Sequence, residues 1–187
     1  MENADKTCYF IEQVADFFRY NIQQQSRTAT IDEELGLIDN FVYIMKVRFG
    51  KRLEFKKEIP EETFPQHIPS MTLQPLVENC IKHGLKNTKG KVTLKVEKED
   101  KFIVISVSDN GEGMSEKTRD AVFKAVAAEN TRLPADALDD NSTHNGTGLI
   151  SVFLRLQLQF HRYDLFDITT GDNGEGTKFI IRIPHHV

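Results

Sequence analysis

The segment LQPLVENCIKHG (residues 73–84) has the periodicity of a helix and places an amide and two basic side chains on one face. Asn79, Lys82 and His83 lie three and four residues apart there, opposite the apolar positions. The amide oxygen of Asn79 suits Mg²⁺, which keeps several waters and takes further ligands from phosphate. Lys82 and His83 could then face phosphate oxygens. The alternative is an ordinary polar surface, which every amphipathic helix has.

A second segment, VISVSDNGEGM (104–114), ends an apolar strand in a carboxylate and two glycines. Asp109 could accept a hydrogen bond from an exocyclic amino group such as that of adenine. Gly111 and Gly113 would let the backbone approach a flat ring without a Cβ in the way. A simple turn is the alternative, and the second copy of DNGEG (172–176), between two strands, is predicted to be a hairpin turn.

A third segment, NGTGL (145–149), places Gly146 and Gly148 before an apolar helix that starts near Leu149. A glycine-rich loop that runs into a helix N-terminus can bind an anion through free N–H groups and the helix dipole. Two such glycines alone are weak evidence, and the spacing matches neither the Walker nor the Rossmann pattern. In this order, the three segments together indicate a site for ATP and a divalent metal.

The N-terminal part of the chain is predicted to be helical. A first helix spans residues 2–22, and a polar connection leads to a second, which begins after Thr30 because Thr30 and Glu33 have capping-box spacing. Gly50 is expected to end this helix. We expect these two helices to form a segment distinct from the rest of the chain, and their apolar faces to contribute to a dimerisation stalk.

From residue 51 the pattern changes to strands and helices that would build one sheet. A strand begins at Leu53, a helix that Pro75 should kink or restart covers residues 69–85, and two alternating strands with a charged turn near Glu99 form a hairpin over 91–109. Residues 114–145 lack sustained periodicity and are expected to form a long lid or to be disordered. A helix over 148–160 and strands at 164–170 and 177–183 complete an α+β sandwich, one sheet covered on one face by helices.

Composition narrows the class of protein further. The chain has 187 residues and a formal net charge of −4, which argues against nucleic acid as the main partner. No run of 18 apolar residues and no signal-peptide pattern occurs, so we expect a cytoplasmic fragment. Cys8 and Cys80 lie far apart and are expected to be buried thiols rather than a disulfide.

With these residues in hand, the chain resembles the catalytic, ATP-binding region of sensor histidine kinases, and more narrowly the LytS/YehU type. LQPLVENCIKHG matches the N box of that family, SDNGEGM the G1 box, and GTGLISVFLRL the G2 box with its following helix. GEGTKFIIRIP is similar to the closing glycine turn and last strand. Upstream, DFFRYNI and DEELGLIDNFVYIMKVRFGKRLEF resemble the family's segment between the phosphoacceptor helix and the kinase domain, so the resemblance covers nearly the whole chain.

The resemblance implies the Bergerat fold of the GHKL (HATPase) superfamily, with ATP and Mg²⁺ as cofactors. Asn79 would bind Mg²⁺, Lys82 and His83 would face phosphate, and Asp109 would read adenine. Glu78 could orient or deprotonate the acceptor imidazole. The further positions that would surround the nucleotide are Gly111, Gly113 and Met114 at the base, Gly146, Gly148 and Leu149 over the phosphates, and Thr177 near Asp109.

The resemblance also predicts organisation and partners. Residues 1–50 would be the end of the dimerisation and phosphotransfer region with its linker, and residues 51–187 the kinase domain. The family's phosphoacceptor motif, Asn-Pro-His-Phe-Leu-Phe-Asn, is absent. We therefore expect a protein histidine kinase, an ATP-dependent phosphotransferase, whose acceptor histidine lies outside this chain and which cannot phosphorylate itself. A response regulator, a homodimeric full-length protein and a membrane-bound parent with this domain on its cytoplasmic side are the other expectations.

Two departures from the family pattern concern the lid. Ser151 replaces an Asn that is common in the G2 helix, and the lid is long and acidic near residues 136–140. Two other functions stay open. One is an ATPase of the chaperone or topoisomerase type, although Pro75 occupies the position of their catalytic Glu. The other is a partner-binding module that has lost nucleotide, although Asn79, Asp109 and both lid glycines are present.

Overall fold

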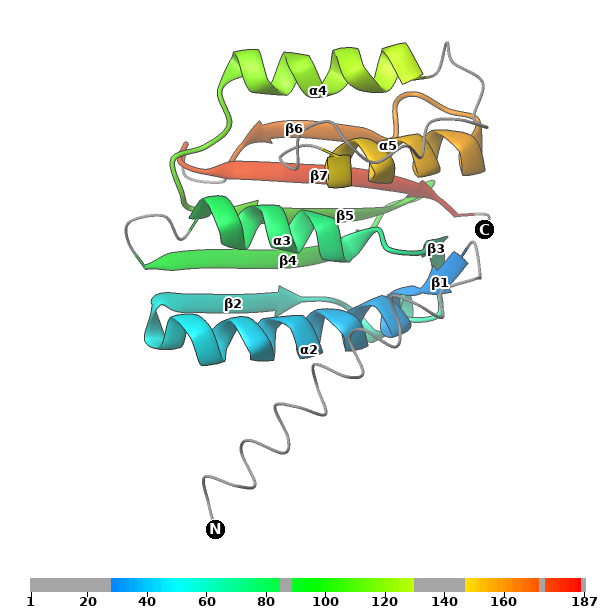
Figure 1. Ribbon diagram of the computed structural model, residues 1–187. Coiled ribbons are helices and arrows are strands. Elements are labelled where there is room, and N and C mark those ends of the chain that lie inside the picture. The colour runs from blue at the N-terminus through cyan, green and yellow to red at the C-terminus, as the bar shows by residue number, and fades with distance from the viewer. Residues whose placement is uncertain (1–27, 85–88, 130–146, 172–173, 186–187) are drawn as a thin grey trace.

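A five-stranded mixed sheet organises the chain (Figure 1). The computed structural model describes residues 28–84, 89–129, 147–171 and 174–185, so the helix predicted over residues 2–22 lies outside the described residues. The strands follow the order β2-β4-β5-β7-β6, with β2 parallel to β4 and all other neighbours antiparallel. Their bounds are β2 (Leu53–Glu58), β4 (Gly90–Lys98), β5 (Phe102–Asp109), β6 (Phe166–Thr170) and β7 (Thr177–Pro184).

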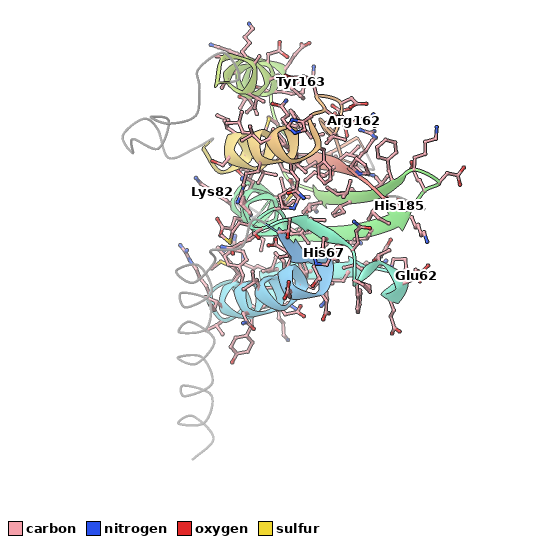
Figure 2. The ribbon with its side chains drawn as sticks, turned by 90° about the vertical axis from the view of Figure 1, so that its right-hand side faces the viewer. Glu62, His67, Lys82, Arg162, Tyr163 and His185 are labelled. Carbon is pink, nitrogen blue, oxygen red and sulfur yellow. The ribbon has the colours of Figure 1, made fainter. Side chains whose placement is uncertain are left out.

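Helices cover one face of this sheet, and Figure 2 shows them together on one side of the strands. They are α2 (Ile31–Phe49), α3 (Leu73–Gly84), α4 (Glu116–Glu129) and α5 (Thr147–Phe160). The strands alternate accordingly: in β7, Phe179, Ile181 and Ile183 are buried toward the helices while the residues between them are partly exposed. The prediction of an α+β sandwich with helices on one face is confirmed.

Short elements connect these layers. β1 (Thr28–Thr30) pairs antiparallel with β3 (His67–Pro69) in a separate two-stranded sheet. One 3₁₀ turn (Gly50–Arg52) leads from α2 into β2, and another (Glu61–Thr63) lies between β2 and β3. Among the helices of the described ranges, none is both long and apolar enough to cross a membrane.

Helix α2 begins and ends where the sequence predicts. The Thr30 hydroxyl accepts a hydrogen bond from the Glu33 N–H at 3.2 Å, and the Glu33 carboxylate accepts one from the Thr30 N–H at 2.8 Å. Gly50 has a φ of 56° and ends the helix. The buried side of α2, including Ile38 and Phe41, belongs to the same hydrophobic core as the sheet. A separate segment over residues 1–50 stays a prediction, but α2 itself packs as part of the sheet domain.

Helix α3 differs from its prediction at its first turn. It begins at Leu73 rather than near residue 69, because residues 67–69 pair as strand β3. Pro75 lies within the first turn of a continuous helix, where an N–H has no helical acceptor, so the predicted kink is wrong. The predicted apolar side is confirmed as fully buried or nearly so: Leu73, Val77, Cys80 and Ile81.

The expectation of an irregular lid over residues 114–145 is wrong for its first half, which forms α4. The Ser115 hydroxyl accepts a hydrogen bond from the Thr118 N–H at 3.1 Å and so caps the helix. Val122 and Val126 are buried, and the Phe123 ring stacks on Phe166 of β6 with centroids 5.6 Å apart. Residues 130–146 lie outside the described residues.

The remaining predicted elements are confirmed. The β4–β5 hairpin closes through the Glu99 N–H, which donates to the Phe102 carbonyl at 2.8 Å. Helix α5 and the final strand pair β6–β7 lie within a few residues of their predicted bounds. The second DNGEG copy lies in the β6–β7 connection, where the Gly174 N–H donates to the Gly171 carbonyl at 3.0 Å.

Candidate functional site

A pocket of about 330 Å³ opens between α3, α4 and α5 at the end of strand β5. Its volume is within the range of small-molecule sites. Its lining residues are Asn79, His83, Asp109, Gly113, Met114, Ser115, Thr118, Val122, Leu149, Thr177 and Phe179. Apolar side chains thus share the wall with a few polar groups, which is the usual composition of a site that binds a flat, polar-edged ring.

Asp109 supplies the most distinctive polar atom of this pocket. Its side chain is only 5% exposed, and its Oδ1 accepts a hydrogen bond from the Gly111 N–H at 2.8 Å. Its Oδ2 is buried and has no hydrogen-bond partner within the described part of the chain. A buried acceptor without a donor costs free energy. A ligand that brings an N–H donor, such as the exocyclic amino group of adenine, would satisfy it.

The surroundings of Asp109 bear on its ionisation. Burial raises the pKa of the carboxyl group, and the Gly111 N–H, the Cys80 thiol and the Thr177 N–H act in the opposite direction. Cys80, fully buried on α3, has a thiol pKa raised first by burial and then by the Asp109 charge. A donor delivered by a ligand would favour the ionised carboxylate, because hydrogen bonds to the charged form lower the pKa.

Close backbone contacts hold Asp109 in place. A Cβ on Gly111 would lie 2.7 Å from the Gly84 Cα, so Gly111 packs against the end of α3 and does not line the pocket. A Cβ on Gly176 would lie 1.9 Å from the Asp109 carbonyl oxygen. The second DNGEG copy is therefore both the predicted turn and a support behind Asp109. Gly113, with a φ of 80°, also approaches Gly176 and does line the pocket.

Helix α3 contributes Asn79 and His83 to the pocket wall. The Asn79 Nδ2 donates to the Pro75 carbonyl at 2.7 Å, which fixes the amide and leaves its oxygen as the group available to a ligand. Lys82 is exposed and does not line the pocket; Figure 2 shows it at the outer surface on the helix side. Glu78 lies outside the lining as well, and the Gln74 amide donates to it at 2.7 Å.

The N-terminus of α5 lies beside the first turn of α3. A Cβ on Gly148 would be 3.4 Å from the Pro75 Cβ, and the next residue, Leu149, lines the pocket. Gly148 itself does not line it, and Gly146 lies outside the described residues. The first N–H groups of a helix have no acceptor within the helix, and a helix N-terminus in this place is of the kind that can bind phosphate.

These contacts give the pocket two ends along α3. A Cβ on Gly84 would lie 3.1 Å from the Asp109 Cβ, whereas Gly148 meets Pro75 at the other end of the helix. Gly84 comes nine positions after Pro75, which is about 13 Å along a helix. Asn79 lies between them. One elongated ligand could therefore place a base near Asp109 and phosphates near Asn79 and α5.

Sequence reasoning missed four lining residues: Ser115, Thr118, Val122 and Phe179. Three of them were missed because α4 was not predicted, although Ser115 followed by Thr118 is a usable capping signal. Phe179 is an inward residue of β7 and has no local mark of function. Within the described ranges, no cluster of three or more His, Cys, Asp or Glu residues could hold a metal, so any Mg²⁺ would depend on Asn79 and ligand oxygens.

Comparison with known proteins agrees with this geometry. The family described as "Histidine kinase-, DNA gyrase B-, and HSP90-like ATPase" matches residues 67–187, and the family described as "Histidine kinase" matches residues 1–53. The catalytic domain of histidine kinase ThkA superposes with a TM-score of 0.56 at 16% identity, covering 85% of this chain and 96% of that one. The mycobacterial sensor histidine kinase MprB superposes with a TM-score of 0.52 at 19% identity, covering 84% of this chain and 95% of that one.

Curated relatives are sensor proteins of the same kind. The sensor protein LytS of Streptococcus agalactiae is 28% identical over 99% of this chain and 30% of its own length. The sensor protein kinase HptS of Staphylococcus aureus is 32% identical over 93% of this chain and 31% of its own length. The chain thus spans less than a third of these relatives. With the family match over residues 67–187, the chain belongs to the histidine kinase-, DNA gyrase B- and HSP90-like ATPases.

Proposed function

We propose that this chain is the ATP-binding catalytic domain of a LytS-type sensor histidine kinase, which transfers the γ-phosphoryl group of ATP to a histidine outside the chain. The observation that carries the proposal is the buried Oδ2 of Asp109 in the pocket, which has no hydrogen-bond partner among the described residues. Such an atom selects a ligand with an N–H donor, as the 6-amino group of adenine provides. The glycine-rich supports around it are consistent with a flat ring.

The other end of the pocket supports binding of a triphosphate with Mg²⁺. The Asn79 oxygen is a neutral, hard ligand, and the remaining Mg²⁺ ligands would be water and phosphate oxygens. His83 lines the pocket and could donate to phosphate, and Leu149 places the N-terminus of α5, a helix end that favours anions, at the same pocket. When bound, Mg²⁺ supplies charge neutralisation for phosphoryl transfer. The residues of this chain would hold the nucleotide in line with an acceptor.

The same residues favour a kinase over a hydrolase. Among the described residues that line the pocket, Asp109 is the only carboxylate, and it lies at the end proposed for adenine. Pro75 occupies the position where chaperone and topoisomerase ATPases carry their catalytic Glu, and it packs against Gly148. Among the described lining residues, no carboxylate is thus placed to activate water beside the phosphates. A role for Glu78 toward the acceptor stays a prediction.

The wider assembly is inferred from the relatives. We propose that residues 1–50 connect this domain to a phosphoacceptor region, that a response regulator receives the phosphoryl group, and that the full-length protein is a homodimer with this domain in the cytoplasm. The match of residues 1–53 to the histidine kinase family and the naming of LytS and HptS as sensor proteins support this arrangement.

Nucleotide titration tests the proposal. ATP with Mg²⁺ is titrated calorimetrically into the wild type, Asn79→Ala and Asp109→Asn. Asn79→Ala removes a Mg²⁺ ligand and should weaken binding at least tenfold, about 1.4 kcal/mol. Asp109→Asn keeps the shape but turns a donor toward the adenine amino group, so affinity should fall roughly 10- to 100-fold, as for other hydrogen bonds to charged groups.

A matched control is Asn40→Ala, which truncates the same side chain on α2 away from the pocket and should bind like the wild type. A wild-type chain that releases no binding heat with ATP and Mg²⁺ would contradict the proposal. So would binding that neither pocket substitution weakens, since the nucleotide would then occupy another place.

A further inference from the structure

Glu34 of α2 carries a carboxylate that is fully buried (0% exposed) outside the pocket. It accepts three hydrogen bonds from consecutive backbone N–H groups: Met71 donates to Oε1 at 2.6 Å, and Thr72 and Leu73 donate to Oε2 at 3.1 and 2.9 Å. These groups lie at the start of α3, where N–H groups have no helical acceptor. A carboxylate from a different helix thus caps α3, a task that usually falls to the residue before the helix.

Arg155 of α5 holds the other side of the same turn. Its Nη1 donates to the Ser70 carbonyl at 2.6 Å and its Nη2 to the Met71 carbonyl at 2.7 Å. Met71 is therefore held at its N–H by Glu34 and at its carbonyl by Arg155. Its φ of 59° is left-handed, a conformation that is unfavourable for a residue with a Cβ. Such a conformation persists where neighbouring groups fix it on several sides.

The pKa shifts of Glu34 and Arg155 agree with a role for this pair in fixing the position of the turn. Burial raises the pKa of Glu34, and the three N–H groups followed by the Arg155 charge act against burial. Burial lowers the pKa of Arg155, and the Glu34 charge acts against it. Buried charges are seldom better for stability than apolar side chains of similar size. Here the pair fixes the geometry of the turn, because the carboxylate and the guanidinium together bind five backbone groups of residues 70–73.

Along α3, the clamped turn lies nearer to Asn79 than to the end of the helix that contacts Asp109. Leu73 precedes Asn79 by six residues, about 9 Å along the helix. On α5, Arg155 comes the same number of residues after the lining residue Leu149. Asp109, in contrast, is held at the opposite end of α3 by β5 and Gly84. A change in the turn should therefore move the Asn79 side of the pocket more than the Asp109 side.

We propose that Glu34 and Arg155 are positioning residues for the phosphate end of the nucleotide site: they fix the start of α3, and hence Asn79, relative to α5. The inference rests on the proposed function, because it takes Asn79 as the group that faces Mg²⁺ and phosphate. Glu34 precedes residues 67–187, the range that matches the ATPase family. Helix α2 thus completes the site from outside that range.

Binding of two ligands shows whether Glu34 positions the Asn79 end of the pocket or only stabilises the whole fold. The variant is Glu34→Gln, which keeps the shape but turns an amide N–H₂ toward backbone donors. ATP with Mg²⁺ reports on the Asn79 end, and adenosine, followed by ligand-observed NMR, reports on the Asp109 end. We expect Glu34→Gln to weaken ATP with Mg²⁺ about tenfold and to change adenosine binding less than twofold. In the Asn79→Ala background, Glu34→Gln should add little further loss with ATP.

The control is Glu33→Gln, which removes the same charge from the same turn of α2. Glutamine can still accept the Thr30 N–H of the capping box, so this variant should bind both ligands like the wild type. Should Glu34→Gln fail to fold, Arg155→Lys takes its place, since lysine keeps the charge but cannot span two carbonyls. Equal losses for both ligands, or unchanged ATP affinity, would overturn the inference. A wild type that binds no ATP would instead overturn the proposed function.

Discussion

Burial raises the pKa of Asp109, and only one of its two carboxylate oxygens has a hydrogen-bond partner within the described residues. Asn79 is arranged differently: its Nδ2 is bound to the Pro75 carbonyl, and its oxygen is the part left for a ligand. Each residue thus presents one acceptor atom to the pocket. For Asp109, this arrangement has a cost that can be measured as a dependence of stability on pH.

We predict that Asp109→Asn becomes more stable relative to the wild type as pH rises from about 4 to 7. A folded-state pKa above the ordinary value of 3.8 means that the folded protein holds this proton more tightly than the unfolded chain. The resulting stabilisation is complete below the unfolded-state pKa and is lost as pH rises through the folded-state pKa. Asparagine does not titrate, so the variant escapes this loss.

Denaturant unfolding at several pH values measures the free energy of unfolding of the wild type and of Asp109→Asn. The contributions of other titrating groups are common to both proteins and cancel in the difference. A stability difference that stays constant with pH, or that comes to favour the wild type as pH rises toward 7, would contradict a raised pKa for Asp109. The same variant is expected to bind ATP poorly. Stability and binding should therefore change in opposite directions at this residue.

At the scale of elements, glycine turns bring distant strands together behind the pocket. Within the second DNGEG copy, Gly176 lies against the carbonyl of Asp109, the first residue of the other copy, whereas a Cβ added to Gly174 would meet open space. The sequence predicted a hairpin turn for the second copy. It could not show that this turn supports the first copy, because that contact joins residues more than sixty positions apart.

Because a sequence pattern shows local order but not distant contacts, elements with strong local signals could be predicted and others could not. Helix α2 has a capping box and a sustained apolar stripe, and both of its ends were predicted correctly. Helix α4 buries mainly Val122 and Val126 and is otherwise rich in alanine and polar residues, so its local periodicity is weak. Asn79, His83 and Asp109 were predicted to share a site and line one pocket. Lys82 was grouped with them by helical spacing, but its side chain points to the outer surface.

The two glycines of the second copy provide a matched pair of substitutions. Gly174→Ala should cost about 1–2 kcal/mol, because its φ of 78° is left-handed but its Cβ would meet nothing. Gly176→Ala should cost roughly 3 kcal/mol or more, because the left-handed φ is combined with overpacking against the Asp109 backbone. Chemical denaturation of the two variants compares the costs. Equal losses of stability would show that the turn does not press on Asp109.

At the scale of the whole molecule, the boundary between the two family matches does not coincide with a boundary in the packing. Residues 1–53 match one family and residues 67–187 the other, yet α2 shares its core with the sheet and caps α3 through Glu34. Helix α2 therefore belongs to the same packed unit as α3 and α5, which carry residues of the pocket (Figure 1).

If Asp109 and Asn79 bind opposite ends of one nucleotide, a crystal structure with a non-hydrolysable ATP analogue and Mg²⁺ will show both contacts. We expect the adenine amino group within hydrogen-bond distance of the Asp109 Oδ2, and the Asn79 oxygen at about 2.1 Å from the Mg²⁺. An analogue bound elsewhere, or bound in this pocket with either side chain directed away from it, would show that these two residues do not bind one nucleotide.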